Sequence, residues 1–503
     1  MRAKALKFNM LAGWLSEIFA LISGLILPRL MITTFGSATN GMVSSIAQFL
    51  GFTVILRAGL GAVTRAALYK PLAEKDEAAI SGIMSATQSY MRKVAMIILG
   101  YILTVAVVYP LFAKGDFSYM TMFSMVLIVG SVTFADNFFG IKAKILLQAA
   151  QKYYVETLCH LASSIVAFAV SVLLITINCD VLIVKIGAAL AAFINPLLLN
   201  LYIRKKFNLN IKAKPNNNAI KQRWDAFAQQ MAVVVNQNVD LVLLTLFVEL
   251  KEISVYTVHS MITINIKKVV TSMVTGINST FGDMIAKDEK ENLKTVFLFI
   301  EWALFAACTI LFSVTAIMIV PFISIYTESV TDVNYIRPFF AFAITTVALI
   351  DCMRIPYQMI TEAAGHFKQT RNGAILEVIL NIVASLVLLW LFGIVGVIIG
   401  TFIAGFVRTS QYAMHALKNV LHISPWHLVR SYGIYFITFI GLYFGFSFIE
   451  FKADTNFLNW VLSAIIVTVI CVVVVSIISL INNKSQVKYL KNKLIRKNNG
   501  AKK

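Results

Sequence analysis

Long apolar runs recur along almost the whole chain and limit what it can fold into. An α-helix rises about 1.5 Å per residue, so a run of ~20 apolar residues can cross the ~30 Å hydrocarbon core of a bilayer. The 503 residues are 59% hydrophobic and only 14% charged, and the mean hydropathy is +0.79. These values exclude a soluble protein with a water-exposed surface. We therefore expect an integral membrane protein.

The sequence predicts fourteen transmembrane helices. A backbone that faces lipid must satisfy its hydrogen bonds within its own segment, and the runs lack the alternation of barrel strands, so we expect α-helices. The first run is longer than a signal-peptide core and is interpreted as an uncleaved helix. The expected spans are 8–33, 41–68, 81–112, 117–146, 152–178, 181–204, 224–248, 254–283, 291–325, 335–361, 371–392, 394–417, 429–450 and 457–482.

Positive charge is distributed unequally between alternate loops. If the N-terminus is cytoplasmic, the loops on the opposite side carry only Lys114, Lys251 and Lys452, and all the other Lys and Arg outside the expected helices lie on the cytoplasmic side. The positive-inside rule then predicts that both termini are cytoplasmic. Topology and attraction to anionic membrane lipids account for the net charge of +20, so no nucleic-acid partner is expected.

The tripeptide Lys-Asp-Glu occurs at 75–77 and again at 287–289, 212 residues later. Other residues recur at nearly the same offset and at the same place in the helix count. Helices 1–6 and 7–12 are therefore expected to be two copies of one lobe, which are parallel because six is even. The other recurring pairs are Pro110 with Pro321, Asp136 with Asp351, Gly187 with Gly400, and Ala-Ala at 149–150 with Ala-Ala at 363–364.

The predicted fold class is an all-α integral membrane protein in which two parallel six-helix repeats surround a central cavity. Two such lobes are typical of alternating-access transporters. Two further helices follow the second repeat. The expected boundaries are 1–204 for the N-lobe, 205–223 for a cytoplasmic linker, 224–418 for the C-lobe, 419–482 for the last two helices and 483–503 for a basic cytoplasmic tail.

Three cations are expected at the middle of the bilayer. Arg57 lies about 11 residues, or ~16 Å, from the cytoplasmic end of span 41–68, and Lys267 and Lys268 lie ~13 residues inside span 254–283. Charges at this depth are costly and tend to face a cavity or a partner. The three are predicted to bind an anion such as a pyrophosphate. The alternative is that the lysines snorkel or pair with Asp283 or Asp240.

Polar residues inside other spans are the remaining candidates. Amides at Asn236, Gln237 and Asn238 suit sugar hydroxyls, although hydrogen bonds between helices are an equally common use of such residues. Asp351 has Arg354 one turn away and is expected to form a salt bridge. Four acids are candidates for proton or sodium coupling, with structural pairing as the alternative: Asp136, which has no such neighbour along the helix, Glu17, Asp240 and Glu301.

No enzyme activity is expected from the sequence. A membrane-embedded glycosyltransferase or polymerase would need catalytic carboxylates or histidines in a large loop, and the longest outer connection spans only about ten residues. The sequence also contains no nucleophile constellation, glycine-rich phosphate loop or metal-ligand spacing. Neither a cofactor nor a metal is therefore predicted.

Three stretches resemble a known family: "LPRLMITTFGSATNGMVSSI", "LRAGLGAVTRAAL" and "VDLVLLTLFVELKEISVYTV". Together with two six-helix repeats and two additional helices, they are similar to the polysaccharide-transporter branch of the MATE/oligosaccharidyl-lipid exporter superfamily. That branch includes Wzx-type O-antigen and capsule flippases and teichoic-acid flippases. The lipid II flippases are more distant. The resemblance covers nearly the whole chain.

The resemblance implies a multi-pass protein of the bacterial cytoplasmic membrane that translocates an undecaprenyl-pyrophosphate-linked oligosaccharide. Members of the family carry cations in the central cavity, including an arginine that Arg57 matches, whereas Lys267 and Lys268 match only through the internal repeat. Polysaccharide polymerases and glycosyltransferases are the implied partners. A MATE-type multidrug antiporter is the alternative function, although such proteins usually have twelve helices and export organic cations.

Overall fold

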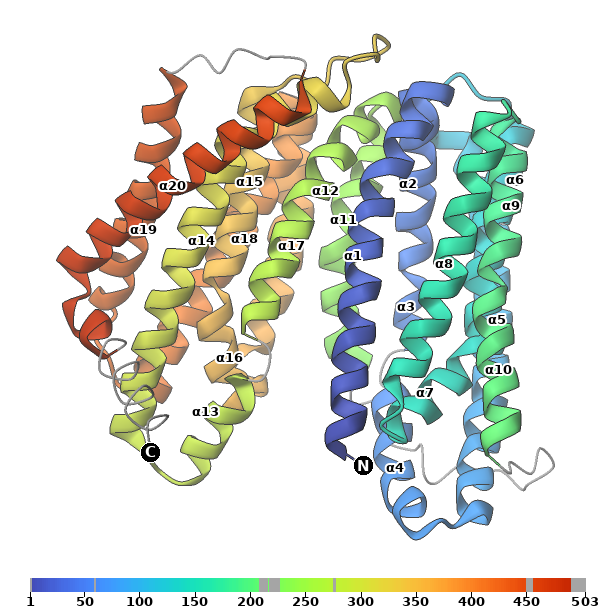
Figure 1. Ribbon diagram of the computed structural model, residues 1–503, viewed down its shortest axis with the longest axis horizontal. Helices are drawn as coiled ribbons and strands as arrows, with labels where there is room; N and C mark the ends of the chain where they lie inside the picture. The colour runs from blue at the N-terminus through green and yellow to red at the C-terminus, as the bar shows by residue number, and fades with distance from the viewer. Residues whose placement is uncertain are drawn as a thin grey trace. The chain divides into compact units, whose positions relative to one another are not determined.

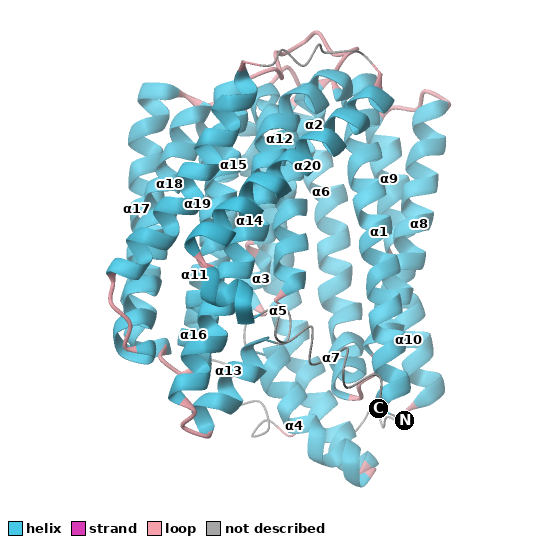
Figure 2. Cartoon of the chain, turned by 60° about the vertical axis from the view of Figure 1, so that its left-hand side comes forward, coloured by secondary structure: helices cyan, strands magenta, loops and turns pink. Residues whose placement is uncertain are grey.

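The computed structural model describes residues 2–57, 60–207, 216, 227–274, 277–448 and 456–489. Most of the predicted linker 205–223 and most of the basic tail lie outside these residues. The described secondary structure consists of helices joined by turns and short loops (Figure 2). The predicted all-α fold class is confirmed.

The chain forms two compact units, of which the first comprises Met1–Val255 with Val330–Val333. Its helices are colored from blue to light green in Figure 1. They are α1 (Arg2–Phe35), α2 (Ser37–Gly51), α3 (Thr53–Leu56), α4 (Leu60–Glu74), α5 (Glu77–Phe112), α6 (Tyr119–Ala135), the π-helix η1 (Asp136–Gly140), α7 (Ile141–Ala149), α8 (Tyr153–Thr176), α9 (Val181–Ala192), α10 (Ile194–Lys206), α11 (Phe227–Phe247) and the start of α12 (Leu250–Met273).

The second unit comprises Tyr256–Ser329 and Asn334–Lys503. Its long helix α14 packs against α15, α19 and α20 around a core that includes Phe305 and Phe439 (Figure 1). The helices are the rest of α12, α13 (Ile277–Ala286), α14 (Lys290–Tyr326), α15 (Pro338–Met353), α16 (Ile355–Ala363), α17 (Phe367–Phe392), α18 (Ile394–Ala416), the π-helix η3 (Leu417–Leu421), α19 (Trp426–Ser447) and α20 (Phe457–Asn482).

Within the described residues, 12 helical spans are long and apolar enough to cross a membrane. The other two predicted spans, 224–248 and 254–283, coincide with α11 and with α12 plus α13. Charged side chains, among them Lys267 and Lys268, make α12 less apolar than the other long helices. The multi-pass character is therefore confirmed, and the count of fourteen stays a prediction.

The division between the units falls after α11, later than the predicted linker. Hydrogen bonds hold α11 and the start of α12 to α2: Ser45 Oγ and Thr245 Oγ1 are 2.7 Å apart, and Asn40 Nδ2 donates to Ser254 Oγ at 2.8 Å. Gly41 permits this approach, because a Cβ there would lie 1.8 Å from the Leu250 carbonyl oxygen. The seventh predicted helix thus packs with the first unit.

Turns at corresponding places support the internal repeat. The Lys-Asp-Glu segments both connect two helices, with Lys75 at φ 57° in one and Asp288 at φ 54° in the other. The helix ends after the repeated Ala-Ala pairs are also alike, with Gln151 at φ 58° and Gly365 at φ 73°. In each, an amide two residues past the helix reaches back to a carbonyl in its last turn, the pattern of a Schellman cap.

Helix pairs pack closely at the repeated glycines. A Cβ at Gly187 would approach Leu174 on α8 to 2.6 Å, and one at Gly400 would approach the backbone nitrogen of Ser385 on α17 to 2.5 Å. These positions therefore bring α9 against α8 and α18 against α17 in the same manner. The Lys-Asp-Glu turns, the Ala-Ala helix ends and these glycines are thus three of the five sequence pairs with similar structural roles.

Candidate functional site

Arg57 lies where a predicted membrane helix is interrupted. Helix α3 ends at Leu56, Arg57 caps it at φ −104° and ψ 3°, and α4 begins at Leu60. Such a break is consistent with the glycine-rich sequence that follows Arg57, because glycine weakens a helix interior. Arg57 therefore lies at a break in the helix, and its side chain is 30% exposed.

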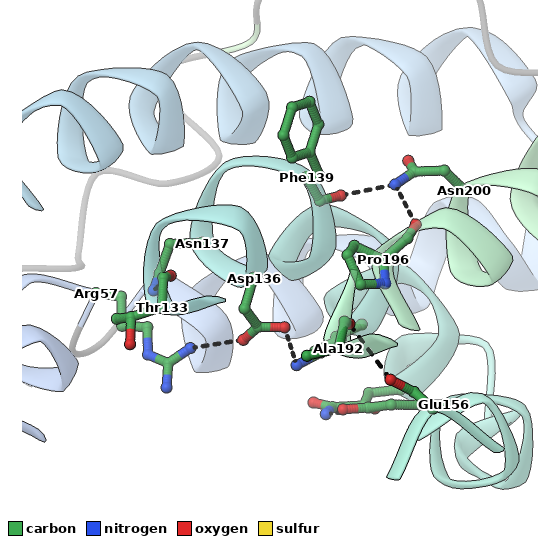
Figure 3. Close-up of polar contacts among 12 residues, drawn as sticks. Arg57, Thr133, Asp136, Asn137, Phe139, Glu156, Ala192, Pro196 and Asn200 are labelled. Carbon is green, nitrogen blue, oxygen red and sulfur yellow. Dashed lines mark hydrogen bonds and ion pairs between the residues drawn. The ribbon is translucent and has the colours of Figure 1, made fainter. Parts of the chain in front are cut away.

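Asp136 begins the π-helix η1, and its surroundings show how the irregular turn is stabilised (Figure 3). Asn200 Nδ2 on α10 donates to the carbonyl oxygens of Phe139 at 2.8 Å and Pro196 at 2.7 Å. Asn137 Nδ2 donates to the Thr133 carbonyl at 2.7 Å. Single π-turns in α-helices often mark functional positions, and this one is held by side-chain hydrogen bonds.

Two cations share the Asp136 carboxylate. Lys144 Nζ on α7 lies 2.5 Å from Oδ1, and Arg57 Nη1 lies 3.7 Å from Oδ2, with Arg57 and Asp136 directed toward one another in Figure 3. Asp136 has no cation one turn away along its helix, as expected, and its partners come instead from tertiary packing, which supplies Arg57, and from α7, which supplies Lys144. The cluster carries two positive charges against one negative charge.

A second acid extends this cluster toward α8. Glu156 Oε2 accepts from Gln148 Nε2 at 2.9 Å, and Gln148 Oε1 accepts from Arg65 Nη1 at 2.8 Å. The amide therefore connects a cation on α4 to a carboxylate on α8. Sequence reasoning missed Glu156 because it lies close to the start of its helix, where an acidic residue is ordinary.

The second unit holds a similar cluster around Asp351. Lys267 Nζ on α12 lies 2.6 Å from Oδ2, and Arg354 Nη2 lies 3.7 Å from Oδ1. The predicted Asp351–Arg354 salt bridge is thus confirmed. The carboxylate beside Lys267 is Asp351, while Asp283 forms an ion pair with Lys287 at 2.7 Å.

The Asp351 cluster continues through Glu377 on α17. Arg354 Nη1 donates to Glu377 Oε1 at 2.9 Å, and Arg408 Nε on α18 lies 3.5 Å from Oε2. Arg408 is 5% exposed and also donates to the Thr370 carbonyl and to Gln411. Three cations thus face two carboxylates. Neither Glu377 nor Arg408 was predicted, since their pairing depends on the contact between α17 and α18.

The two clusters correspond through the internal repeat. Asp136 and Asp351 are one of the sequence pairs, and Arg57 and Lys267 occupy matching helices, offset by 210 residues. Each unit therefore pairs its repeated aspartate with the cation predicted to bind substrate. In each cluster the cations outnumber the carboxylates by one.

The other predicted site residues have different placements. Lys268 is exposed on α12, one position beyond Lys267, and Glu17 is exposed on α1 among apolar side chains. Asn238 is buried on α11 and donates to the Val234 carbonyl at 2.6 Å, while Asp240 on the same helix is partly buried. The side chains of Asn236 and Gln237 lie outside the described residues, so their sugar-binding role stays a prediction.

Glu301 on α14 is 2% exposed and accepts two hydrogen bonds within the second unit. The Tyr357 hydroxyl on α16 donates to Oε1, and His427 Nε2 on α19 lies 2.6 Å from Oε2. Sequence reasoning named Glu301 but missed both partners, which come from helices distant in the sequence. The described residues contain no group of three or more His, Cys, Asp or Glu side chains arranged to hold a metal ion.

Comparison with solved structures identifies the fold. An inward closed lipid II flippase MurJ matches with a TM-score of 0.70 and 16% identity, over 95% of this chain and 99% of that one. An inward-facing multidrug resistance MATE family transporter of the MOP superfamily matches with a TM-score of 0.63 and 15% identity, over 80% of this chain and 96% of its own. A MOP superfamily transporter from Pyrococcus furiosus has a TM-score of 0.51 and 15% identity, over 83% and 96%.

No family model matches the sequence, and no curated protein does so. These three solved structures are distant in sequence, so their similarity shows the fold alone. This chain therefore has the fold that MurJ shares with the MATE transporters of the MOP superfamily.

Proposed function

We propose that this protein is a flippase that translocates an undecaprenyl-pyrophosphate-linked oligosaccharide across the bacterial cytoplasmic membrane by alternating access. The oligosaccharide is of the O-antigen, capsule or teichoic-acid type. The fold is that of MurJ, whose structure is named for a lipid II flippase and covers 95% of this chain. The resemblance to the polysaccharide-transporter branch points to the same class of lipid-linked substrate.

The observation that carries this proposal is the excess of cations around the repeated aspartates. Arg57 and Lys144 share Asp136, and Lys267 and Arg354 share Asp351. Moving a pyrophosphate through a membrane requires positive charges that offset its own, because an unpaired charge in a medium of low dielectric constant is costly. A carrier of organic cations would instead favour an excess of carboxylates over cationic side chains.

The distances suggest how a substrate could exchange with the carboxylate. Lys144 is close to Asp136, at 2.5 Å, whereas Arg57 is farther away, at 3.7 Å. If Arg57 turns to a pyrophosphate, Asp136 still keeps Lys144 as its counter-ion. The carboxylate then prevents unpaired positive charge in the empty state, while Arg57 remains available for a bidentate contact with phosphate oxygens.

The remaining predicted roles belong to the same proposal. Lys267 and Lys268 contribute further positive charge to the pyrophosphate, amides at 236–238 hold the sugar, and the lipid tail remains among membrane lipids. Reorientation is driven by the membrane potential, at ~2.3 kcal/mol per charge per 100 mV, or by H⁺ or Na⁺ at an acidic residue such as Asp136, Glu17, Asp240 or Glu301. Polymerases and glycosyltransferases act on either side of the transport step.

The test compares Arg57→Ala, Arg57→Glu and Arg57→Lys in a strain that lacks the gene. Lipid-linked oligosaccharide should accumulate with the alanine and glutamate variants and fall toward the wild-type level with lysine, which keeps the charge. Arg92→Ala, which changes an exposed arginine on α5, is the control. Normal transport by Arg57→Glu at normal protein levels would remove Arg57 from the proposed site.

A MATE-type multidrug antiporter is the second candidate function. The fold similarity to an inward-facing MATE transporter, with a TM-score of 0.63, favours it. Drug-susceptibility assays of the deletion strain separate the two candidates. Increased sensitivity to organic cations without accumulation of lipid-linked sugar would support the antiporter and contradict the flippase.

A further inference from the structure

A buried polar cluster connects three helices of the second unit. Glu301 comes from α14, Tyr357 from α16 and His427 from α19. Both carboxylate oxygens of Glu301 accept hydrogen bonds, Oε1 from Tyr357 and Oε2 from His427. Helix α19 follows the second six-helix repeat, so this contact joins one of the additional helices to a repeat helix.

The surroundings of Glu301 are aromatic. Tyr357 packs against Phe297, Phe305 and Tyr432, with ring centroids 5.6, 6.3 and 6.2 Å away. The Tyr432 hydroxyl is buried without a hydrogen-bond partner. A carboxylate in such surroundings depends on its two donors, because few other polar groups are positioned to stabilise its charge.

The distance between His427 and Glu301 requires a proton between them. Nε2 and Oε2 are 2.6 Å apart, and two lone pairs at that distance would repel one another. A neutral imidazole that uses its Nε2 proton here leaves the cluster with one negative charge. A second proton on Nδ1 converts it into an ion pair with no net charge, which is less costly to bury.

The imidazole of His427 is the least buried part of the cluster. The His427 side chain is 25% exposed, whereas the side chain of Glu301 is 3% exposed. Ser431 Oγ lies 3.3 Å from His427 Nε2, on the same helix. Proton exchange can therefore take place at the imidazole without exposure of the carboxylate.

We propose that Glu301, His427 and Tyr357 form a proton-binding site that fastens α19 to α14 and α16. When the second proton is bound, imidazolium and carboxylate attract one another across the contact between helices. Loss of this proton weakens the attraction between the helices and leaves a buried negative charge on Glu301. The site depends on the fold of the second unit and not on the substrate, so it stands whether or not the flippase proposal does.

The other titratable or charged groups around the cluster are tyrosines, one cysteine and one arginine. Tyr357, Tyr432 and Tyr435 interact electrostatically with Glu301. Tyr432 also interacts with Arg354 and with Cys308 on α14. Tyrosine and cysteine are neutral near neutral pH in an apolar site, and arginine keeps its charge, so an imidazole is the kind of side chain here that can take up a second proton.

The first test measures thermal unfolding of the purified full-length protein at pH 6 and pH 8. Glu301→Gln should lower Tm more at pH 6 than at pH 8, by at least about 2 °C, because imidazolium loses its counter-ion at the lower pH. Tyr357→Phe should lower Tm equally at both. The double variant Glu301→Gln/His427→Gln should show no additional pH dependence, and His160→Gln, at an exposed histidine on α8, is the control.

The second test observes the protons in folded protein labelled with ¹⁵N-histidine. The signal that His427→Gln removes should change between pH 8 and pH 6 in the wild type and change less in Glu301→Gln. Equal Tm losses at both pH values, or a His427 signal whose response to pH is the same with and without Glu301, would overturn the proposal. A variant that does not fold leaves the wild-type titration as the decisive measurement.

Discussion

Lys267 Nζ and Asp351 Oδ2 lie 2.6 Å apart, within hydrogen-bonding distance. The repeat-equivalent pair, Arg57 and Asp136, is separated by 3.7 Å, and Lys144 occupies the nearer position instead. The two copies therefore keep the same pairing of charges with different strengths. This asymmetry predicts that the two aspartates respond differently to substitution.

Asp351→Asn should destabilise the second unit by about 1–3 kcal/mol. Breaking a buried ion pair leaves an uncompensated cation, and the partial exposure of Lys267 reduces the usual cost. The measurement is thermal unfolding in detergent. The double variant Asp351→Leu/Lys267→Met should regain part of the stability that Asp351→Asn loses. A double variant that loses as much stability as the two single changes added together would contradict the pairing.

Glu377→Gln should cost about 3 kcal/mol, because it removes the carboxylate shared by Arg354 and the buried Arg408. The same change at the exposed Glu291, near the start of α14, should leave stability within about 0.5 kcal/mol of the wild type. Unfolding midpoints of the two variants provide the comparison. Equal midpoints would mean that the network around Glu377 contributes nothing to folding.

Gly396→Ala should severely reduce the yield of folded protein. A Cβ at this position would lie 1.9 Å from the carbonyl oxygen of Leu388, a backbone atom that cannot move without displacing α17. Gly433→Ala on α19 meets nothing within 4 Å and should be neutral or slightly stabilising, because alanine favours a helix. Size-exclusion chromatography of both variants measures the difference. A monodisperse Gly396→Ala protein with unchanged Tm would contradict the close packing.

Gly365→Ala should destabilise by about 1 kcal/mol, because its φ of 73° is unfavourable for a residue with a Cβ. The repeat-equivalent change in the other direction, Gln151→Gly, should be neutral or stabilising by less than about 1 kcal/mol, since relief at φ 58° is offset by the greater freedom of glycine when unfolded. Gly365→Ala should therefore lower Tm, whereas Gln151→Gly should leave Tm unchanged or raise it slightly. Equal losses would show that the two turns are not equivalent.

The elements that could be predicted from the sequence are those that depend on local patterns. Apolar runs defined the spans because length and hydropathy suffice to mark a membrane helix. The repeat was visible because Lys-Asp-Glu and the Ala-Ala pairs lie at helix ends, where turn geometry restricts the residue types. The break beside Arg57 agrees with the glycines that follow it.

Contacts between distant helices could not be predicted from one sequence. Lys144 and Asp136 are eight residues apart, beyond the one-turn spacing that marks a helical ion pair, and the π-helix between them alters the register. His427 and Glu301 come from different helices, and nothing in either local sequence indicates the other. The pairing of Glu377 with Arg408 likewise depends on how closely α17 and α18 approach.

The left-handed turn at Gln151 has kept its shape although its counterpart is Gly365. Two copies of one ancestral lobe would share such a turn whichever of the two residues occupies it. Six predicted crossings return a chain to the side on which it began, so two separate copies of that ancestor would have inserted in the same direction. Fusing them end to end would then have required only a connecting segment, with no inversion of either copy.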